Sequence, residues 1–136
     1  MKENLLRVTH MLKEVHRRFL ELERLDAEKF FERRISPFDF LQILTHDKNF
    51  KWLQPFSALI AELDAFLEES ENVSDEDLVC MKDQIAFVLR RSVGDSFLYD
   101  RYQTHLNNDP NFVLLHANLN EALNRLKPTD ISKNLS

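Results

Sequence analysis

Residues 5–22 read LLRVTHMLKEVHRRFLEL, and the spacing of the apolar side chains in this stretch decides the fold class. Apolar residues recur at intervals of three and four positions, the repeat of one face of an α-helix. The residues of this seam are Leu5, Val8, Leu12, Val15, Phe19 and Leu22. Four further residues widen or continue the stripe: Met11, Leu25, Phe30 and Phe31. The pattern predicts one long helix over about 3–33, whose exposed face carries Lys13, Glu14, Arg17, Arg18, Glu21, Glu23 and Arg24.

Glycine occurs once among the 136 residues, as Gly94. Phosphate-binding loops, dinucleotide-binding turns and tight β-hairpins need residues that accept a positive φ, which glycine supplies most easily. A chain with one glycine cannot form the glycine-rich fingerprints of nucleotide-binding proteins. The composition therefore favours helices joined by short turns of Asn, Asp, Ser and Pro.

Capping signals divide the rest of the chain into shorter helices. Ser36 and Asp109 are good N-caps, and each is followed by a proline that suits the first helical turn. Ser74 with Asp77 forms a short variant of the capping box. Gly94 is expected to act as a C-terminal cap or turn, before a helix that starts at 95 or 96.

The segment after residue 36 is expected to form a short helix over about 37–45, with Phe38, Leu41 and Leu44 facing inward. Asp47 then caps a turn that contains Trp52. Pro55 lies in the first turn of the next helix or kinks it. The sequence therefore predicts a single all-α domain: a helical bundle of five or six helices over residues 1–126, followed by a polar tail over 127–136.

Two stretches resemble a family of small bacterial all-helical proteins. They are FLQILTHDKNFKWLQPFSALIAELD at 40–64 and DPNFVLLHA at 109–117. The family pattern combines Asp-x-x-Phe-x-Trp-Leu-x-Pro-x-Ser-x-Leu-Ile with a late Asp-Pro followed by His. This chain has Lys48 where the family pattern has proline. The resemblance covers residues 32–117 and implies the helical fold, but it implies no activity and no catalytic residue.

Five residues are candidates for a pocket or binding site: His46, Asp47, Trp52, Tyr102 and His116. Asp47 could orient His46 as a general base, or it could cap the next turn beside an exposed histidine. Trp52 could anchor a partner or fill the core between helices. His116 could line a pocket with Trp52 and Tyr102, or lie at the edge of the core with a hydrogen-bond partner.

The candidate metal and charge features favour structural interpretations. No histidine follows a glutamate by three residues, as in di-iron bundles, so we expect no metal site and no cofactor. Cys80 is expected to be a small core residue. An acidic patch carries −8 without a lysine or arginine, so the rest of the chain carries +3; its members are Glu62, Asp64, Glu68, Glu69, Glu71, Asp75, Glu76 and Asp77. We expect it to be a solvated helix end and turn.

The net charge of −5 argues against binding to a phosphate backbone, and no apolar run reaches the length of a membrane span. We therefore expect a cytoplasmic protein with no nucleic acid or membrane partner. The sequence favours a non-enzymatic interaction or regulatory protein, with dimerisation through the first helix as one mode. The alternative is a small-molecule-binding or hydrolytic enzyme with a site near His46, Trp52, Tyr102 and His116.

Overall fold

The computed structural model describes residues 2–90 and 97–126, and every regular element in these ranges is helical. The elements are α1 (Lys2–Phe31), α2 (Pro37–His46), the 3-10 helix η1 (Lys48–Leu53), α3 (Gln54–Glu69), α4 (Asp75–Arg90), α5 (Phe97–Asn108) and α6 (Pro110–Arg125). The predicted all-α bundle with a long N-terminal helix is confirmed. The expected turn at Gly94, the helix start at 95 or 96 and the tail over 127–136 lie outside the described residues.

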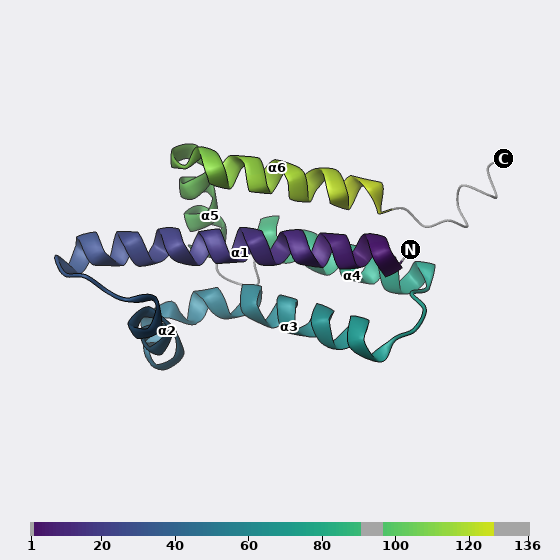
Figure 1. Ribbon diagram of the computed structural model, residues 1–136, viewed down its shortest axis with the longest axis horizontal. Coiled ribbons are helices and arrows are strands. Elements are labelled where there is room, and N and C mark those ends of the chain that lie inside the picture. Colours follow the sequence, from purple (N-terminus) through teal and green to yellow (C-terminus); the bar gives the residue numbers. More distant parts are fainter. Residues whose placement is uncertain (1, 91–96, 127–136) are drawn as a thin grey trace.

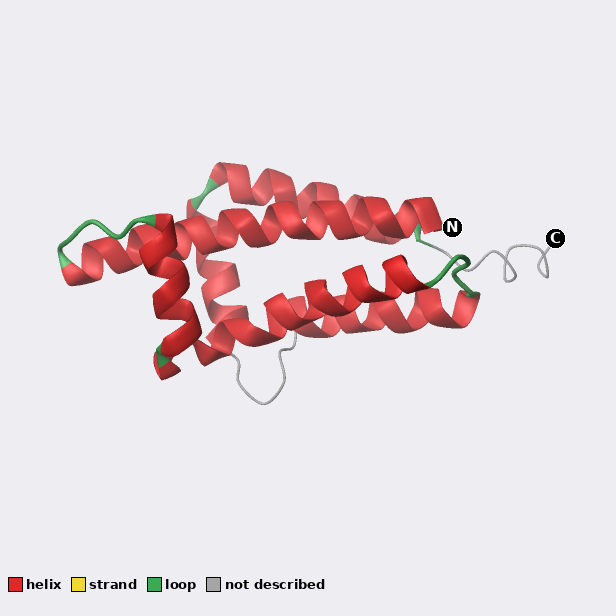
Figure 2. Cartoon of the chain, turned by 60° about the horizontal axis from the view of Figure 1, so that its bottom comes forward, coloured by secondary structure: helices red, strands yellow, loops and turns green. Residues whose placement is uncertain are grey.

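The helix α1 runs along the whole bundle, and the other helices pack around it (Figure 1). Helices α6 and α3 lie on either side of α1, and both run antiparallel to it. Helix α4 packs on α3, and the short α5 packs on α6. Helix α2 lies crosswise near the C-terminal end of α1 (Figure 2).

The apolar seam of α1 forms the centre of the core, but it changes register after Phe19. Leu5, Val8, Leu12, Val15 and Phe19 are fully buried, and the next buried positions on the helix are Glu23 and Ala27. Leu22, the predicted continuation, is only partly buried. Glu23 follows Leu5 by 18 residues, about five turns at about 3.6 residues per turn, so the two residues lie on the same face of a straight helix. The prediction that Glu23 is exposed is therefore wrong.

The predicted N-caps of α2 and α6 are confirmed. The hydroxyl of Ser36 accepts a hydrogen bond from the N–H of Asp39 at 3.1 Å. The carboxylate of Asp109 accepts one from the N–H of Phe112 at 2.9 Å. Both side chains pair with backbone donors that the first helical turn leaves unpaired.

Two other predicted helix starts are also found. Ser74 accepts from the N–H of Asp77 at 3.1 Å, and the carboxylate of Asp77 accepts from the N–H of Ser74 at 3.3 Å, which is a reciprocal capping box. Pro55 lies in the first turn of α3.

Helix α1 ends without a glycine. Glu32 adopts a left-handed conformation with φ 54°, and the N–H of Arg33 donates to the carbonyl of Glu28 at 3.2 Å. This is the Schellman pattern, in which glycine usually occupies the position held here by Glu32.

Helix α2 buries Phe40 instead of Phe38 and Leu41, whereas Leu44 packs inward as expected and is partly buried against the core. Phe40 is buried against Ala27 and Ile35, whereas Phe38 and Leu41 are exposed. The helix has apolar residues on more than one face, so its own periodicity does not select the buried side. The side is selected by Ile35 in the preceding connection, which provides a fully buried contact for Phe40.

Two further burial expectations are wrong. Leu25, Phe30 and Phe31 do not continue the core stripe but are exposed, because α1 extends beyond the helices that cover its earlier turns. Cys80 is exposed on α4 rather than buried, because the buried face of this helix is formed by Leu78 and Ile85.

The ring of Phe19 packs against several other aromatic rings of the core. Its centroid lies 5.3–6.1 Å from five rings, which belong to Trp52, Phe56, Tyr102, His105 and Phe112. These spacings fit the usual edge-to-face and offset arrangements. The side chain therefore links α1 to η1, α3, α5 and α6.

We expect Phe19→Ala to lower the free energy of unfolding by about 3–5 kcal/mol, because it leaves a cavity at the centre of the core. Urea denaturation monitored by circular dichroism measures this loss. Phe38→Ala is the matched control, since this side chain is 68% exposed, and its change should stay within about 0.5 kcal/mol. Equal losses for the two variants would contradict the central role of Phe19.

Candidate functional site

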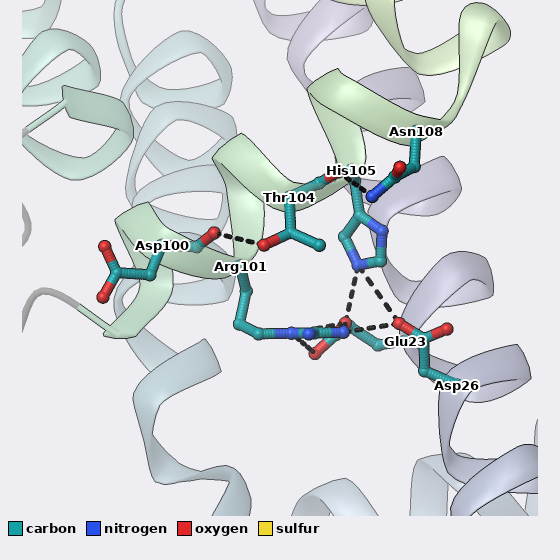
Figure 3. Close-up of polar contacts among 7 residues, drawn as sticks. All are labelled: Glu23, Asp26, Asp100, Arg101, Thr104, His105 and Asn108. Atoms are coloured by element: carbon teal, nitrogen blue, oxygen red, sulfur yellow. Dashed lines mark hydrogen bonds and ion pairs between the residues drawn. The ribbon is translucent and has the colours of Figure 1, made fainter.

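A charged cluster joins α1 to α5 inside the bundle (Figure 3). Glu23 is 5% exposed, and its carboxylate accepts a hydrogen bond from Nε2 of His105 at 2.6 Å. The guanidinium of Arg101 donates to Glu23 at 2.5 Å and to Asp26 at 2.5 Å. One buried carboxylate thus has two donors from successive turns of α5.

The electrostatics of the cluster keep Glu23 ionised. Burial alone would raise the pKa of Glu23, but the hydrogen bonds from His105 and Arg101 outweigh this effect and lower the pKa. The same carboxylates hold the pKa of Arg101 above its usual value, chiefly through the hydrogen bond that Arg101 donates to Glu23, against the effect of burial. The cluster is therefore a buried ion pair whose desolvation is offset by good hydrogen bonding.

The cluster also contains the residue types of a metal site. Potential ligand atoms of Glu23, Asp26 and His105 lie within 4.8 Å of one another. The guanidinium of Arg101, however, bonds both carboxylates and neutralises one of their two negative charges. We therefore interpret the cluster as a structural ion-pair network that holds α5 against α1. The sequence analysis missed it; the 18-residue spacing from Leu5 to Glu23 signals that Glu23 is buried but does not identify Arg101 and His105 as its partners.

A second ion pair ties α1 to the start of α6. The guanidinium of Arg18 donates two hydrogen bonds of 2.9 Å to the two carboxylate oxygens of Asp109. The bond from Arg18 and the N–H of Phe112 lower the pKa of Asp109, even though burial acts in the opposite direction. The capping carboxylate of α6 thus also fixes the position of that helix on α1.

Among the candidate site residues, Tyr102 and His116 are in direct contact. Nδ1 of His116 lies 2.7 Å from the hydroxyl oxygen of Tyr102, and its Nε2 lies 3.0 Å from the amide nitrogen of Asn120. Burial raises the pKa of Tyr102. Phe19 packs against both Trp52 and Tyr102 and so links Trp52 to this pair.

His46 and Asp47 lie elsewhere, at the end of α2. They line an open hollow with Gln42, Ile43 and Lys48, and none of the other candidate pocket residues lines it. His46 is exposed. The structure therefore brings together Tyr102 and His116 but does not add His46 and Asp47 to them.

The acidic patch forms the end of α3, the following turn and the start of α4. Asp64 pairs with Lys13 of α1 at 2.8 Å, and Asp77 caps α4. Most of the other members are exposed.

A separate hollow lies between α1 and α3 and has a volume of about 380 Å³. We call it the α1–α3 hollow; it is lined by Lys13, His16, Arg17, Leu20, Ser57 and Ile60. Nε2 of His16 lies 3.2 Å from the hydroxyl oxygen of Ser57. Burial lowers the pKa of His16 to about 4, so the ring is neutral at pH 7.

The most exposed large apolar side chains of the described residues include two pairs near one end of the bundle. Phe30 and Phe31 form the last turn of α1, and Phe38 and Leu41 lie on the outer face of α2; Phe30 is 80% exposed. The two helices pack together through Ala27, Ile35 and Phe40, so both pairs lie at the same end of the molecule (Figures 1 and 2). We call these four residues (Phe30, Phe31, Phe38 and Leu41) the apolar end.

Comparisons with protein-family models, with curated proteins and with solved structures found no match. The resemblance to small bacterial helical proteins therefore stays a prediction. Within the described ranges, no helix has the length and apolar character needed to cross a membrane.

We expect Glu23→Gln to lower the free energy of unfolding by about 3 kcal/mol, because it leaves Arg101 and His105 beside a neutral group inside the protein. Chemical denaturation at pH 7 measures the change. Glu121→Gln is the control, since Glu121 pairs with Arg125 on the surface and its loss should cost less than about 1 kcal/mol. If Glu23→Gln had the same free energy of unfolding as the control, the structural role of the ion-pair network between α1 and α5 would be contradicted.

The change of the free energy of unfolding with pH should depend on His16. Below the unfolded-state pKa of about 6.5, the unfolded chain binds a proton at this residue, whereas the folded chain does so only near its own pKa of about 4. Protonation of the unfolded chain therefore destabilises the folded state as the pH falls through this window. His16→Gln should make the loss of unfolding free energy between pH 6.5 and pH 4 smaller, as measured by urea titrations across that range. A loss in His16→Gln as large as in the unaltered protein would contradict this assignment.

Proposed function

We propose that this protein acts by binding other protein chains, without a catalytic site of its own, and that its first partner is a second copy of itself. The observation that carries the proposal is the apolar end. Phe30 and Phe38 are 80% and 68% exposed. Soluble proteins rarely leave clustered aromatic side chains in water unless a partner covers them, and aromatic residues are preferred as anchors of interfaces.

The proposed interface differs from the seam that first suggested a dimer. The seam of α1 from Leu5 to Phe19 is fully buried by the other helices of the same chain. Of the other apolar residues of α1, Met11 and Leu20 pack partly against the core, while Leu6 and Phe31 are exposed. The proposal therefore moves the contact to the C-terminal end of α1 and to α2.

The charges around the apolar end favour a second copy as the partner. Both signs are present on exposed residues there: Lys29, Glu32, Arg33, Arg34 and Asp39. A twofold interface brings the same surface of two chains together, so a rim of mixed sign can pair with itself. A strongly acidic or strongly basic partner would find like charges on the same rim.

The enzymatic alternative has less support. A site near His46, Trp52, Tyr102 and His116 requires these side chains to share a pocket. His46 lines a hollow that Trp52, Tyr102 and His116 do not line. Both ring nitrogens of His116 already have hydrogen-bond partners.

Sedimentation equilibrium at micromolar concentration tests the proposal. The unaltered protein should have twice the mass of one chain, and Phe30→Glu combined with Phe38→Glu should give single chains with unchanged helix content. The matched control is Val113→Glu combined with Leu114→Glu, because these exposed apolar residues of α6 lie outside the apolar end. The control should remain dimeric. A single-chain mass for the unaltered protein, or a dimer that survives both changes at the apolar end, would overturn the proposed interface.

A further inference from the structure

The α1–α3 hollow combines a suitable volume with convergent polar groups. Its volume of about 380 Å³ lies within the range of about 300–1,000 Å³ that is typical of small-molecule sites. Both of its walls are helices of the main bundle, so its shape does not depend on a long loop.

The inner surface of the hollow is apolar with one neutral polar pair. Leu20 and Ile60 supply the aliphatic surface. The ring of His16 packs edge-on against the buried Phe56 at 4.7 Å, which fixes its orientation. Nε2 of His16 and the hydroxyl oxygen of Ser57 are held 3.2 Å apart; with Nε2–H as the donor, the hydroxyl hydrogen of Ser57 is left for a ligand.

Two cations, Lys13 and Arg17, complete the lining. Lys13 pairs with Asp64 at 2.8 Å, and Arg17 pairs with Glu14 at 3.2 Å. Both pairs are exposed, and the Arg17 side chain is 76% exposed. Exposed ion pairs of this kind contribute little free energy, so a ligand carboxylate can exchange for Asp64 or Glu14 at small cost.

We propose that the α1–α3 hollow binds a small monocarboxylate with an aliphatic body. The aliphatic chain lies against Leu20 and Ile60, and the carboxylate lies between Lys13 and Arg17, where it accepts a hydrogen bond from Ser57. A neutral isostere keeps the apolar contacts but loses the charge-assisted bonds, which are the stronger ones. This site is independent of the apolar end and of the proposed dimer.

Isothermal titration calorimetry with octanoate, and with octanamide as the neutral isostere, tests the proposal. Octanoate should bind one site per chain, about tenfold more tightly than octanamide, the ratio that corresponds to about 1.4 kcal/mol. Proton and nitrogen NMR shifts should change at His16, Ser57 and Ile60. Equal affinities for the two compounds, or shifts that map to the apolar end instead, would overturn the proposal.

Surface variants separate the charge contribution from folding. Lys13→Gln combined with Arg17→Gln should remove the preference for octanoate, whereas Arg125→Gln, an exposed arginine of α6, should keep it. Glu14→Gln combined with Asp64→Asn frees both cations and should strengthen octanoate binding. A weaker or unchanged affinity in this last variant would contradict the placement of the carboxylate. Phe30→Glu combined with Phe38→Glu should bind octanoate normally, so this result is separate from the fate of the dimer.

Discussion

The ionised carboxylate of Glu23 is the constraint on which the arrangement of the helices depends. A buried carboxylate is unstable unless donors surround it, and both of its strong donors, Arg101 and His105, come from α5. Their positions one turn apart fix both the rotation and the height of α5 against α1. Because α5 leads directly into α6, the same carboxylate helps to set where α6 begins, and the Arg18–Asp109 pair completes the attachment.

The sequence predicts the helices well because their signals are local. The caps at Ser36, Ser74 and Asp109 require only their own first turns, and each is found in the structure. Glu23 was assigned to the exposed face because polarity was given more weight than helical geometry. Its burial depends on Arg101, which is 78 residues away. A partner at this distance cannot be read from the spacing within one helix.

The apolar end and the α1–α3 hollow illustrate a different limit of prediction from the sequence. Phe38 and Leu41 were expected inside because they are apolar, but which side of α2 is buried depends on Ile35 and Ala27. The hollow depends on His16 meeting Ser57 across two helices, and neither residue has a sequence signal of its own. Arg17 of the hollow and Phe30 of the apolar end are 13 residues apart along α1, which is about 20 Å at about 1.5 Å per residue. The hollow and the apolar end can therefore bind different partners without overlapping.

The central position of α1 has a consequence for the synthesis of the chain. Helix α1 is synthesised before α2 to α6, yet it packs most extensively on α6, and Arg18 meets its partner 91 residues later in the chain. Until α6 has been made, the seam from Leu5 to Phe19 lacks one of its covering helices. Until then a nascent chain of this protein presents a partly uncovered apolar helix, the kind of segment that chaperones bind. Stalling or truncation before α6 would leave a product that aggregates rather than a smaller folded domain.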